Sequence, residues 1–309
     1  MKRIHVMAAV IERGDDILIA RRPNHLHQGG KWEFPGGKLE AGEAPLVGLD
    51  RELREELGIS VEQAEPLIRI AHDYPDKSVL LDVWRVSAFH GEPDGREGQE
   101  IRWVARQALG DFEFPAANVP IVAAAQLPAV YVISPELETV ETFLAGLEKV
   151  LIRGHQLVQI RPGEMTQVNW RELVDGLEAL KQRFPVQLLL SSRVQWPSEN
   201  VFDGVHLTSR DLMALKQRPV GVRWLAASCH SPEEVAQAER VGVDFITLSP
   251  VLPTASHPDA DALGMETFAD WVEAARLPVY GLGGLALGDL AQMRATGAQG
   301  VAGIRAFWD

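Results

Sequence analysis

The chain has 309 residues, of which 46% are hydrophobic and 24% are charged, and its formal net charge is −13. This length and composition are typical of two ordinary globular domains and exclude a disordered or low-complexity protein. The negative charge also disfavours a nucleic-acid polymer or an anionic membrane as the main partner, because binding to either depends largely on Lys and Arg.

The cysteine content and the first residues bear on the compartment. The single cysteine, Cys229, cannot form an internal disulfide, which suits a reducing compartment. The apolar run that begins at Val6 is soon followed by charged residues, so it is too short for a signal peptide or a membrane anchor. We therefore expect a cytoplasmic protein without a membrane partner.

The first part of the chain mixes strand and helix patterns. Residues 5–12 and 16–22 flank a polar turn as the strands of a β-hairpin do, and residues 78–89 predict another strand rich in β-formers. Residues 45–57 predict an amphipathic helix, because leucines recur there at steps of three and four. The apolar stripe of this helix consists of Leu46, Leu49, Leu53 and Leu57.

Beyond residue 128 the chain alternates apolar strand candidates with amphipathic helical segments. Eight strand candidates lie at residues 129–134, 157–162, 186–192, 204–209, 223–231, 244–251, 277–284 and 300–307. Eight strands that alternate with helices predict a closed, compact (β/α)8 barrel, and an open doubly wound sheet is the alternative. We therefore predict an α/β protein with two domains, residues 1–127 and residues 128–309.

Three carboxylates gather beside the leucine stripe of the predicted helix. At about 100° per residue, Glu52, Glu55 and Glu56 fall within roughly 100° of arc. They repel one another, and two of them lie near the helix C-terminus, where the helix dipole disfavours anions. A solvated acidic face is the simplest interpretation. A bound divalent cation would instead turn the repulsion into coordination, because Mg²⁺ prefers oxygen ligands.

A sequence motif favours the metal. The positions concerned are Gly37, Glu43, Arg51, Glu52, Leu53, Glu55, Glu56, Gly58 and Ile59, and they match G-x5-E-x7-R-E-U-x-E-E-x-G-U at every defined position. The segment therefore resembles the Nudix hydrolases, in which this motif forms a loop-helix-loop that binds Mg²⁺ or Mn²⁺. The resemblance implies an α/β/α sandwich (α+β) around a mixed sheet.

The resemblance also implies roles for individual residues. The implied metal ligands are Glu52, Glu55 and Glu56, together with Gly36. Arg51 would orient a catalytic carboxylate, Gly37 would supply backbone to the site, and Glu43 would be structural.

Segments outside the motif resemble the MutT branch of the Nudix family, whose members remove 8-oxo-dGTP from the nucleotide pool. These segments are residues 21–38, 73–86, 91–104 and 112–120. By resemblance, Asn118 would bind the oxidised purine edge through its amide and Phe34 would line the base pocket. Arg22 and His27 would lie near the nucleotide, and Glu97 would be a further metal ligand or base. Taken singly, each of these residues also has a purely structural interpretation.

The expected mechanism is attack by a metal-activated water on a phosphorus atom of the substrate. Enzymes of the MutT type attack the β-phosphorus and release pyrophosphate and a nucleoside monophosphate. We therefore expect the reaction of 8-oxo-dGTP with water, which would give 8-oxo-dGMP and pyrophosphate, with Mg²⁺ or Mn²⁺ as the cofactor. An alternative keeps this chemistry but takes a thiamine-related diphosphate as the substrate.

Residues 129–309 resemble the thiamine phosphate synthase and TenI family of short (β/α)8 barrels. By resemblance, the barrel would bind a thiazole or pyrimidine phosphate. The glycines at the ends of the last two strands would place a phosphate on backbone amides, although they could also simply form tight turns. The candidate ligand residues are Gln159, Arg161, Asp211, His230, Thr254, Gly283, Gly284 and Gly303.

Departures from the synthase pattern argue against synthase activity. The lysine expected two residues after Arg161 is Gly163, and an expected Asn-Asp pair is replaced by Ser191 and Ser192. Asp211 matches the other expected Mg²⁺ ligand, but the lysine of a Thr-x-Thr-Lys motif is His257. Synthase chemistry must stabilise a departing pyrophosphate, and these losses remove groups that could do so.

Two histidines of the barrel are assigned different roles. His230 stands where TenI-type proteins use a histidine, which suggests a thiazole tautomerase, although a single histidine in such a turn is more often a cap. A non-catalytic, ligand-sensing barrel is a further hypothesis. We interpret His206 as a core histidine with satisfied hydrogen bonds.

Overall fold

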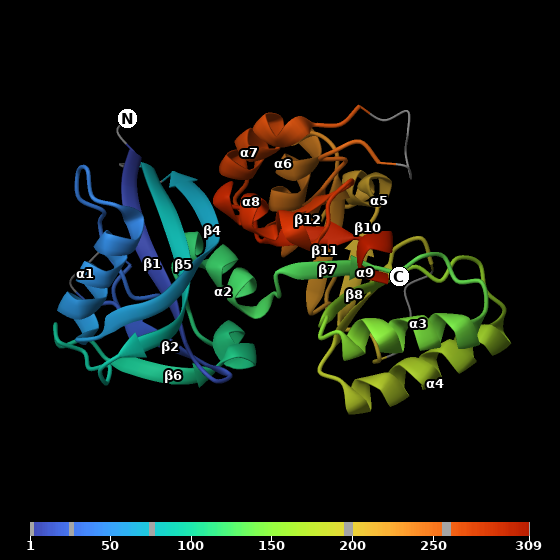
Figure 1. Cartoon of the computed structure of the whole chain (residues 1–309), viewed down its shortest axis with the longest axis horizontal. Helices are drawn as coiled ribbons and strands as arrows, with labels where there is room; N and C mark the ends of the chain where they lie inside the picture. The colour runs from blue at the N-terminus through green and yellow to red at the C-terminus, as the bar shows by residue number, and fades with distance from the viewer. Residues whose placement is uncertain (1–2, 25–27, 74–77, 195–199, 255–260, 309) are drawn as a thin grey trace. The chain divides into compact units, whose positions relative to one another are not determined.

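A computed structural model describes residues 3–24, 28–73, 78–194, 200–254 and 261–308 (Figure 1). The chain divides into two compact units, Met1–Leu127 and Pro128–Asp309. Across the described ranges, the helices are all too short or too polar to cross a membrane.

The N-terminal unit is built on a six-stranded mixed sheet. Its strands are β1 (Arg3–Arg13), β2 (Asp16–Arg21), β3 (Trp32–Glu33), β4 (Ser60–Asp73), β5 (Ser78–His90) and β6 (Ile101–Ala105). The order is β3-β2-β1-β5-β4, with β6 also paired to β2. Strands β1 and β5 are parallel, whereas the other pairs of strands are antiparallel. The predicted hairpin of residues 5–22 is confirmed, since Ile11 pairs with Leu18.

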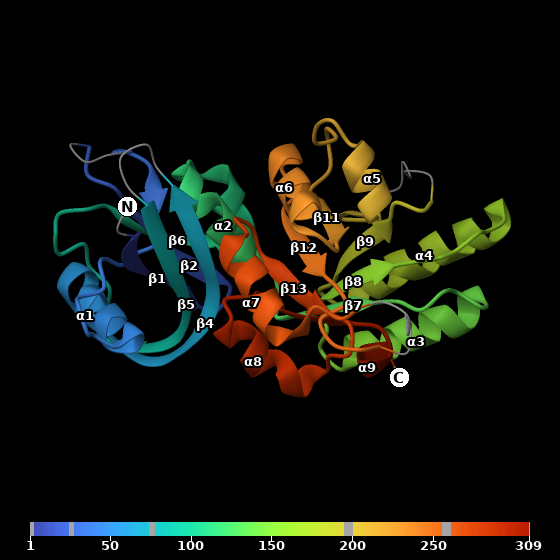
Figure 2. The same ribbon diagram turned by 90° about the horizontal axis from the view of Figure 1, so that it is seen from above.

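Helices cover both faces of this sheet. They are α1 (Pro45–Leu57), the 3-10 helices η1 (Arg106–Asp111) and η2 (Ala116–Asn118), and α2 (Val119–Gln126). Leu49, Leu53 and Leu57 of α1 are fully buried against one face, and Ile121 of α2 is buried in the cluster on the other. The predicted stripe is wrong only at Leu46, which is 43% exposed. The result is the expected three-layer sandwich (Figure 2).

The C-terminal unit is a closed barrel of eight parallel strands, as predicted, and not an open sheet. The strands are β7 (Val130–Ile133), β8 (Leu157–Ile160), β9 (Gln187–Ser191), β10 (Gly204–Leu207), β11 (Trp224–Cys229), β12 (Phe245–Leu248), β13 (Val279–Leu282) and β14 (Gly300–Gly303). The last strand pairs with the first, Val301 with Val130, which closes the ring. All eight strands lie within the ranges predicted from the sequence.

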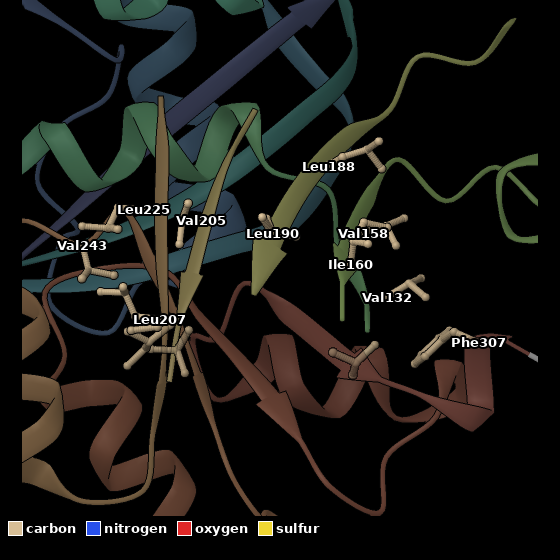
Figure 3. Close-up of a cluster of buried hydrophobic side chains, with 14 of the residues drawn as sticks. Val132, Val158, Ile160, Leu188, Leu190, Val205, Leu207, Leu225, Val243 and Phe307 are labelled. Carbon is tan, nitrogen blue, oxygen red and sulfur yellow. The ribbon is translucent and has the colours of Figure 1, made fainter. Parts of the chain in front are cut away.

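Helices follow most strands of the barrel. They are α3 (Val140–Ile152), α4 (Gln167–Arg183), α5 (Ser209–Ala214), α6 (Pro232–Val241), α7 (Gly264–Ala274), η3 (Leu287–Asp289), α8 (Leu290–Ala295) and α9 (Arg305–Trp308). Strand side chains such as Val132, Leu190 and Val205 belong to one large buried cluster that also includes helix residues (Figure 3). This packing buries the apolar stripes of the helices and stabilises the barrel wall.

Aromatic side chains fill part of the barrel interior. The ring of Tyr131 on β7 lies 5.3 Å from that of Phe245 on β12, and the ring of Tyr280 on β13 lies 5.5 Å from Phe245. Tyr131 also contacts His206 on β10. Because β7, β10 and β12 are not neighbours in the ring of strands, these contacts cross the interior, and the aromatic rings therefore plug the barrel.

Candidate functional site

Helix α1 ends at Leu57 and is capped by Gly58, and the loop that carries Glu97 is hydrogen-bonded to this end. Gly58 has the left-handed conformation (φ 72°) that favours glycine, and its N–H donates to the carbonyl oxygen of Arg54 at 3.1 Å. The N–H of Arg96 and the side-chain amide of Gln99 both donate to the carbonyl oxygen of Glu56 at 3.0 Å. These bonds satisfy the helix C-terminus and hold the loop beside Glu56.

Arg51 connects two glutamates of the motif. Its guanidinium donates to both carboxylate oxygens of Glu43 at 3.0 Å and to Oε1 of Glu52 at 2.7 Å. Such a bidentate bond fixes the guanidinium plane, so the Glu52 carboxylate is held in one orientation. Arg51 thus lies where it can position the Glu52 carboxylate, with Glu43 as its second partner, and the roles of both residues in the reaction stay predictions.

Glu56 is half-buried and lies among other carboxylates. Its Oε2 accepts a hydrogen bond from the N–H of Gly36 at 3.0 Å. Burial, together with the charges of Glu33, Glu97 and Glu52, raises the pKa of Glu56 to about 8. The structure therefore brings three predicted site residues together, with Glu33 added to them. Glu55 differs from these residues because its side chain is 60% exposed. Its Oε2 lies 3.6 Å from Nη1 of Arg51.

The donor chemistry of this carboxylate cluster fits a hard divalent cation. Carboxylate oxygens are the ligands that Mg²⁺ prefers, and like charges near a buried carboxylate are stabilised by a cation. Within the described part of the chain, no three such side chains converge on one metal position. Glu52 is instead bonded to Arg51, and Glu56 to the Gly36 amide. A metal position shared by three of these carboxylates would require some of the side chains to reorient.

Gly37 leaves space that the Glu52 carboxylate occupies. A Cβ atom at residue 37 would lie 2.1 Å from Oε2 of Glu52. We expect Gly37→Ala to displace this carboxylate and to lower kcat/KM for the nucleotide substrate by about 100-fold, because displacements of about 1 Å cost that much. Steady-state kinetics and thermal melting would measure the effect. Gly110→Ala is the control, since a Cβ there meets no atom within 4 Å. Equal activity of the two variants would contradict the prediction.

The predicted base-binding residues lie near the sheet edge and in the segment before α2. Phe34 is buried, and its ring stacks on Phe114 with centroids 5.3 Å apart. Asn118 in η2 is half-buried, and its N–H donates to the carbonyl oxygen of Pro115 at 2.8 Å. Its side-chain amide makes no hydrogen bond to a described residue. That amide therefore retains its donors and its acceptor for a ligand.

Arg22 and His27 are the remaining predicted residues of this unit. Arg22 donates a hydrogen bond to Glu33, which is not among the residues predicted from the sequence. Glu33 lies outside the motif, in the two-residue strand β3. The only sequence features that could have indicated a role at the site are its charge and its position shortly before the glycines. His27 lies outside the described residues.

The barrel contains a cavity of about 630 Å³ at the carboxyl-terminal ends of its strands. The predicted residues that line it are Gln159, Arg161, His230, Thr254, Gly283, Gly284 and Gly303. Asp211 is not among the lining residues. Its carboxylate accepts hydrogen bonds from Ser192 at 2.5 Å and Thr208 at 2.7 Å, at the start of α5. Asp211 thus stabilises the start of this helix.

Four arginines line this cavity, and three of them were not predicted. They are Arg161, Arg193, Arg210 and Arg305, and no Asp or Glu is among the described lining residues. The first three follow the adjacent strands β8, β9 and β10, whereas Gly283 and Arg305 follow β13 and β14. In a ring of eight strands these two groups lie nearly opposite each other. The cavity therefore offers anion-binding groups on two sides.

Two histidines also line the cavity. His230 Nδ1 lies 2.8 Å from the carbonyl oxygen of Ser249. Because a carbonyl only accepts, Nδ1 carries the proton, and Nε2 of neutral His230 is an acceptor. His206 bonds Tyr131 and Ser228 at 2.9 Å each and is 2% exposed, which confirms it as a core histidine with satisfied hydrogen bonds.

Comparison with known proteins gives a match for each unit. The family model of thiamine monophosphate synthase matches residues 130–307, and that of the NUDIX domain matches residues 6–124. The "Putative thiamine-phosphate synthase 2" of Aquifex aeolicus is 34% identical over 183 residues, which are 59% of this chain and 98% of that protein.

Two relatives from Escherichia coli match the N-terminal unit. An 8-oxo-dGTP diphosphatase is 37% identical over 124 residues, covering 40% of this chain and 96% of the relative. A CTP pyrophosphohydrolase is 38% identical over 124 residues, which are 40% of this chain and 92% of the relative. The chain therefore belongs to two families, with a Nudix hydrolase domain of the MutT type in its N-terminal unit and a thiamine monophosphate synthase/TenI domain in its C-terminal unit.

Proposed function

We propose that the N-terminal unit is a Mg²⁺-dependent nucleoside triphosphate pyrophosphohydrolase that converts 8-oxo-dGTP and water to 8-oxo-dGMP and pyrophosphate. The observation that carries this proposal is the pairing of an oriented carboxylate, Glu52, with the half-buried Glu56 beside the glycine turn at Gly36. Removal of an oxidised nucleotide from the pool would serve mutation avoidance, and the relatives named 8-oxo-dGTP diphosphatase support this substrate.

The residues of the site have different proposed roles. Glu52, Glu56 and Glu97 would hold the cation, with Glu55 and the backbone of Gly36. When bound, Mg²⁺ supplies neutralisation of phosphate charge and makes a coordinated water more acidic. Arg51 keeps the Glu52 carboxylate in a fixed orientation, so that it accepts the proton of the attacking water. The half-buried Arg22 would bind the phosphates through its guanidinium fork.

Asn118 is the residue proposed to select the base. A side-chain amide pairs two hydrogen bonds with a purine edge, and such a pair discriminates between bases by about 1–3 kcal/mol. We therefore expect Asn118→Ala to reduce the ratio of kcat/KM for 8-oxo-dGTP to that for dGTP roughly 10-fold to 100-fold, with a smaller effect on dGTP itself.

The same experiment tests the proposed substrate. Turnover of 8-oxo-dGTP, dGTP, CTP and thiamine diphosphate would be compared with Mg²⁺ present, and pyrophosphate would be resolved from orthophosphate. A strong preference for 8-oxo-dGTP with release of pyrophosphate supports the proposal. A preference for CTP or thiamine diphosphate, or unchanged discrimination in Asn118→Ala, would move the assignment to another Nudix substrate.

We infer that the barrel binds a small phosphorylated ligand, such as a thiazole or pyrimidine phosphate, and lacks synthase activity. The observation that favours binding is the cavity with four arginines and no described carboxylate. The missing lysines and the engagement of Asp211 at the start of α5 argue against synthase chemistry. His230, with Nε2 free to accept a proton, keeps a tautomerase reaction among the activities to assay.

Calorimetry with the phosphorylated hydroxyethylthiazole tests ligand binding. Arg305→Gln should weaken binding roughly 10-fold to 100-fold, because a hydrogen bond to a charged group contributes about 1.5–3 kcal/mol. Arg171→Gln, an arginine on α4 outside the cavity, is the matched control and should bind as the wild type does. No heat of binding in the wild-type protein would contradict both the sensor and the tautomerase hypotheses.

A further inference from the structure

The ion pair between Arg22 and Glu33 lies at the edge of the carboxylate cluster. Glu33 ends β3, which pairs antiparallel with β2, and Arg22 follows β2 directly. The N–H of Arg22 donates to the carbonyl oxygen of Lys31 at 2.9 Å, so the backbone holds the two residues on adjacent segments. The Arg22 guanidinium donates to Oε2 of Glu33, and both side chains are about three-quarters buried.

Glu33 is also a neighbour of Glu56. Of the three carboxylates whose charges raise the pKa of Glu56, Glu33 has the largest effect. The chain reaches Gly36, whose N–H donates to Glu56, only three residues after Glu33. Glu33 therefore has two neighbours of opposite kind, the Arg22 guanidinium that compensates its charge and the half-buried Glu56 carboxylate that repels it.

The Arg22 guanidinium fits a phosphate as well as it fits a carboxylate, because both accept the same two-pronged hydrogen bond. If Arg22 turned to a phosphate, the Glu33 carboxylate would be left largely buried, uncompensated and next to Glu56. Such a pair of carboxylates is costly without a cation. A bound divalent cation is then the natural compensation.

We propose that Arg22 exchanges Glu33 for the substrate phosphates, and that the freed Glu33 carboxylate joins Glu56 in holding the divalent cation. The inference rests on the proposed function of this site. It assigns Glu33 as a conditional ligand that Arg22 masks in the nucleotide-free protein. Nucleotide and metal then bind with positive coupling, and by linkage each tightens the other by the same factor.

Mn²⁺ binding, followed by electron paramagnetic resonance of the free ion, measures this coupling without turnover. The full-length protein would be titrated with and without α,β-methylene dGTP, with correction for Mn²⁺ bound by the nucleotide itself. In the wild type we expect the nucleotide to tighten Mn²⁺ binding by about 10-fold, within the usual range of such couplings. Arg22→Gln should bind Mn²⁺ more tightly than the wild type without nucleotide, because Glu33 is unmasked.

Two variants assign the gain to Glu33. Glu33→Gln should lose the tightening by nucleotide, and the double variant Arg22→Gln/Glu33→Gln should lose the gain seen in Arg22→Gln. Arg21→Gln is the matched control, since Arg21 pairs with the exposed Glu100 at 3.3 Å, and it should behave as the wild type. Thermal melting of each variant would verify folding.

The outcomes separate the two proposals. If the wild-type protein binds no Mn²⁺ with or without nucleotide, the proposed metal-dependent function fails. If it binds Mn²⁺ but Arg22→Gln gives no gain, or Glu33→Gln retains the coupling, the exchange of partners is overturned while the hydrolase assignment stands.

Discussion

Glu52→Gln should lower kcat/KM for 8-oxo-dGTP by about 10³-fold, the middle of the range for loss of a positioned acid or base. The amide cannot accept a proton from water and is a poor ligand for Mg²⁺. The fold should persist, because Arg51 keeps its two hydrogen bonds to Glu43 and the helix leucines remain buried. Steady-state kinetics with resolved products would measure the loss.

The matched control for this prediction is Glu40→Gln. Glu40 belongs to the same glycine-rich acidic stretch, but it is exposed and its backbone, not its carboxylate, bonds Glu43. This variant should keep wild-type activity. If Glu52→Gln retained more than a tenth of the wild-type rate, Glu52 would not be the catalytic carboxylate, and Glu97 would be the next candidate.

The barrel should lose stability as the pH falls below 6.5, and His206 is the cause. Burial, together with the charge of Arg161, lowers the pKa of His206 to about 3. In the unfolded chain the imidazole titrates near its ordinary pKa of about 6.5, so between these values the unfolded state binds more protons. The free energy of unfolding should fall on the order of 4–5 kcal/mol between pH 6.5 and pH 3.

Urea unfolding of the full chain at pH 7 and pH 5 would measure this dependence. In His206→Gln, whose amide can still bond Tyr131 and Ser228, the pH dependence of the barrel transition should be weaker by about 2 kcal/mol over that interval. The same slope in both proteins would show that another group governs the acid sensitivity.

The elements with strong periodicity were predictable, and the irregular ones were not. Helix α1 and the eight barrel strands have apolar patterns set by burial. Strand β4 was missed because it carries Glu62, Glu65 and Pro66 and pairs with β5 through several register shifts. Strand β6 has only five residues, too few for a clear alternation. Leu46 shows the limit of periodicity, since its position on the stripe falls at the exposed start of the helix.

For the two sites as well, residues placed by local spacing were predictable from the sequence, whereas residues placed by long-range pairing were not. The motif glutamates were predictable because their spacing along one helix fixes their neighbours. Glu33 and Arg210 were not, since each reaches its site through strand pairing or barrel closure rather than through local spacing. Asp211 is predicted as a ligand residue by resemblance, yet its carboxylate accepts hydrogen bonds from the hydroxyls of Ser192 and Thr208. Thr208 is a local partner, three residues before Asp211, whereas Ser192 becomes evident as a partner only when β9 and β10 lie side by side.

The pairing of the first and last barrel strands bears on the order in which the two units are completed during synthesis. The six strands of the N-terminal unit have all emerged once Ala105 has been made, whereas β7 must wait for β14 before the ring closes. Domains generally fold as units, the N-terminal one first. A ribosome that stopped before Gly300 would thus release a complete hydrolase sheet attached to an open, aggregation-prone barrel.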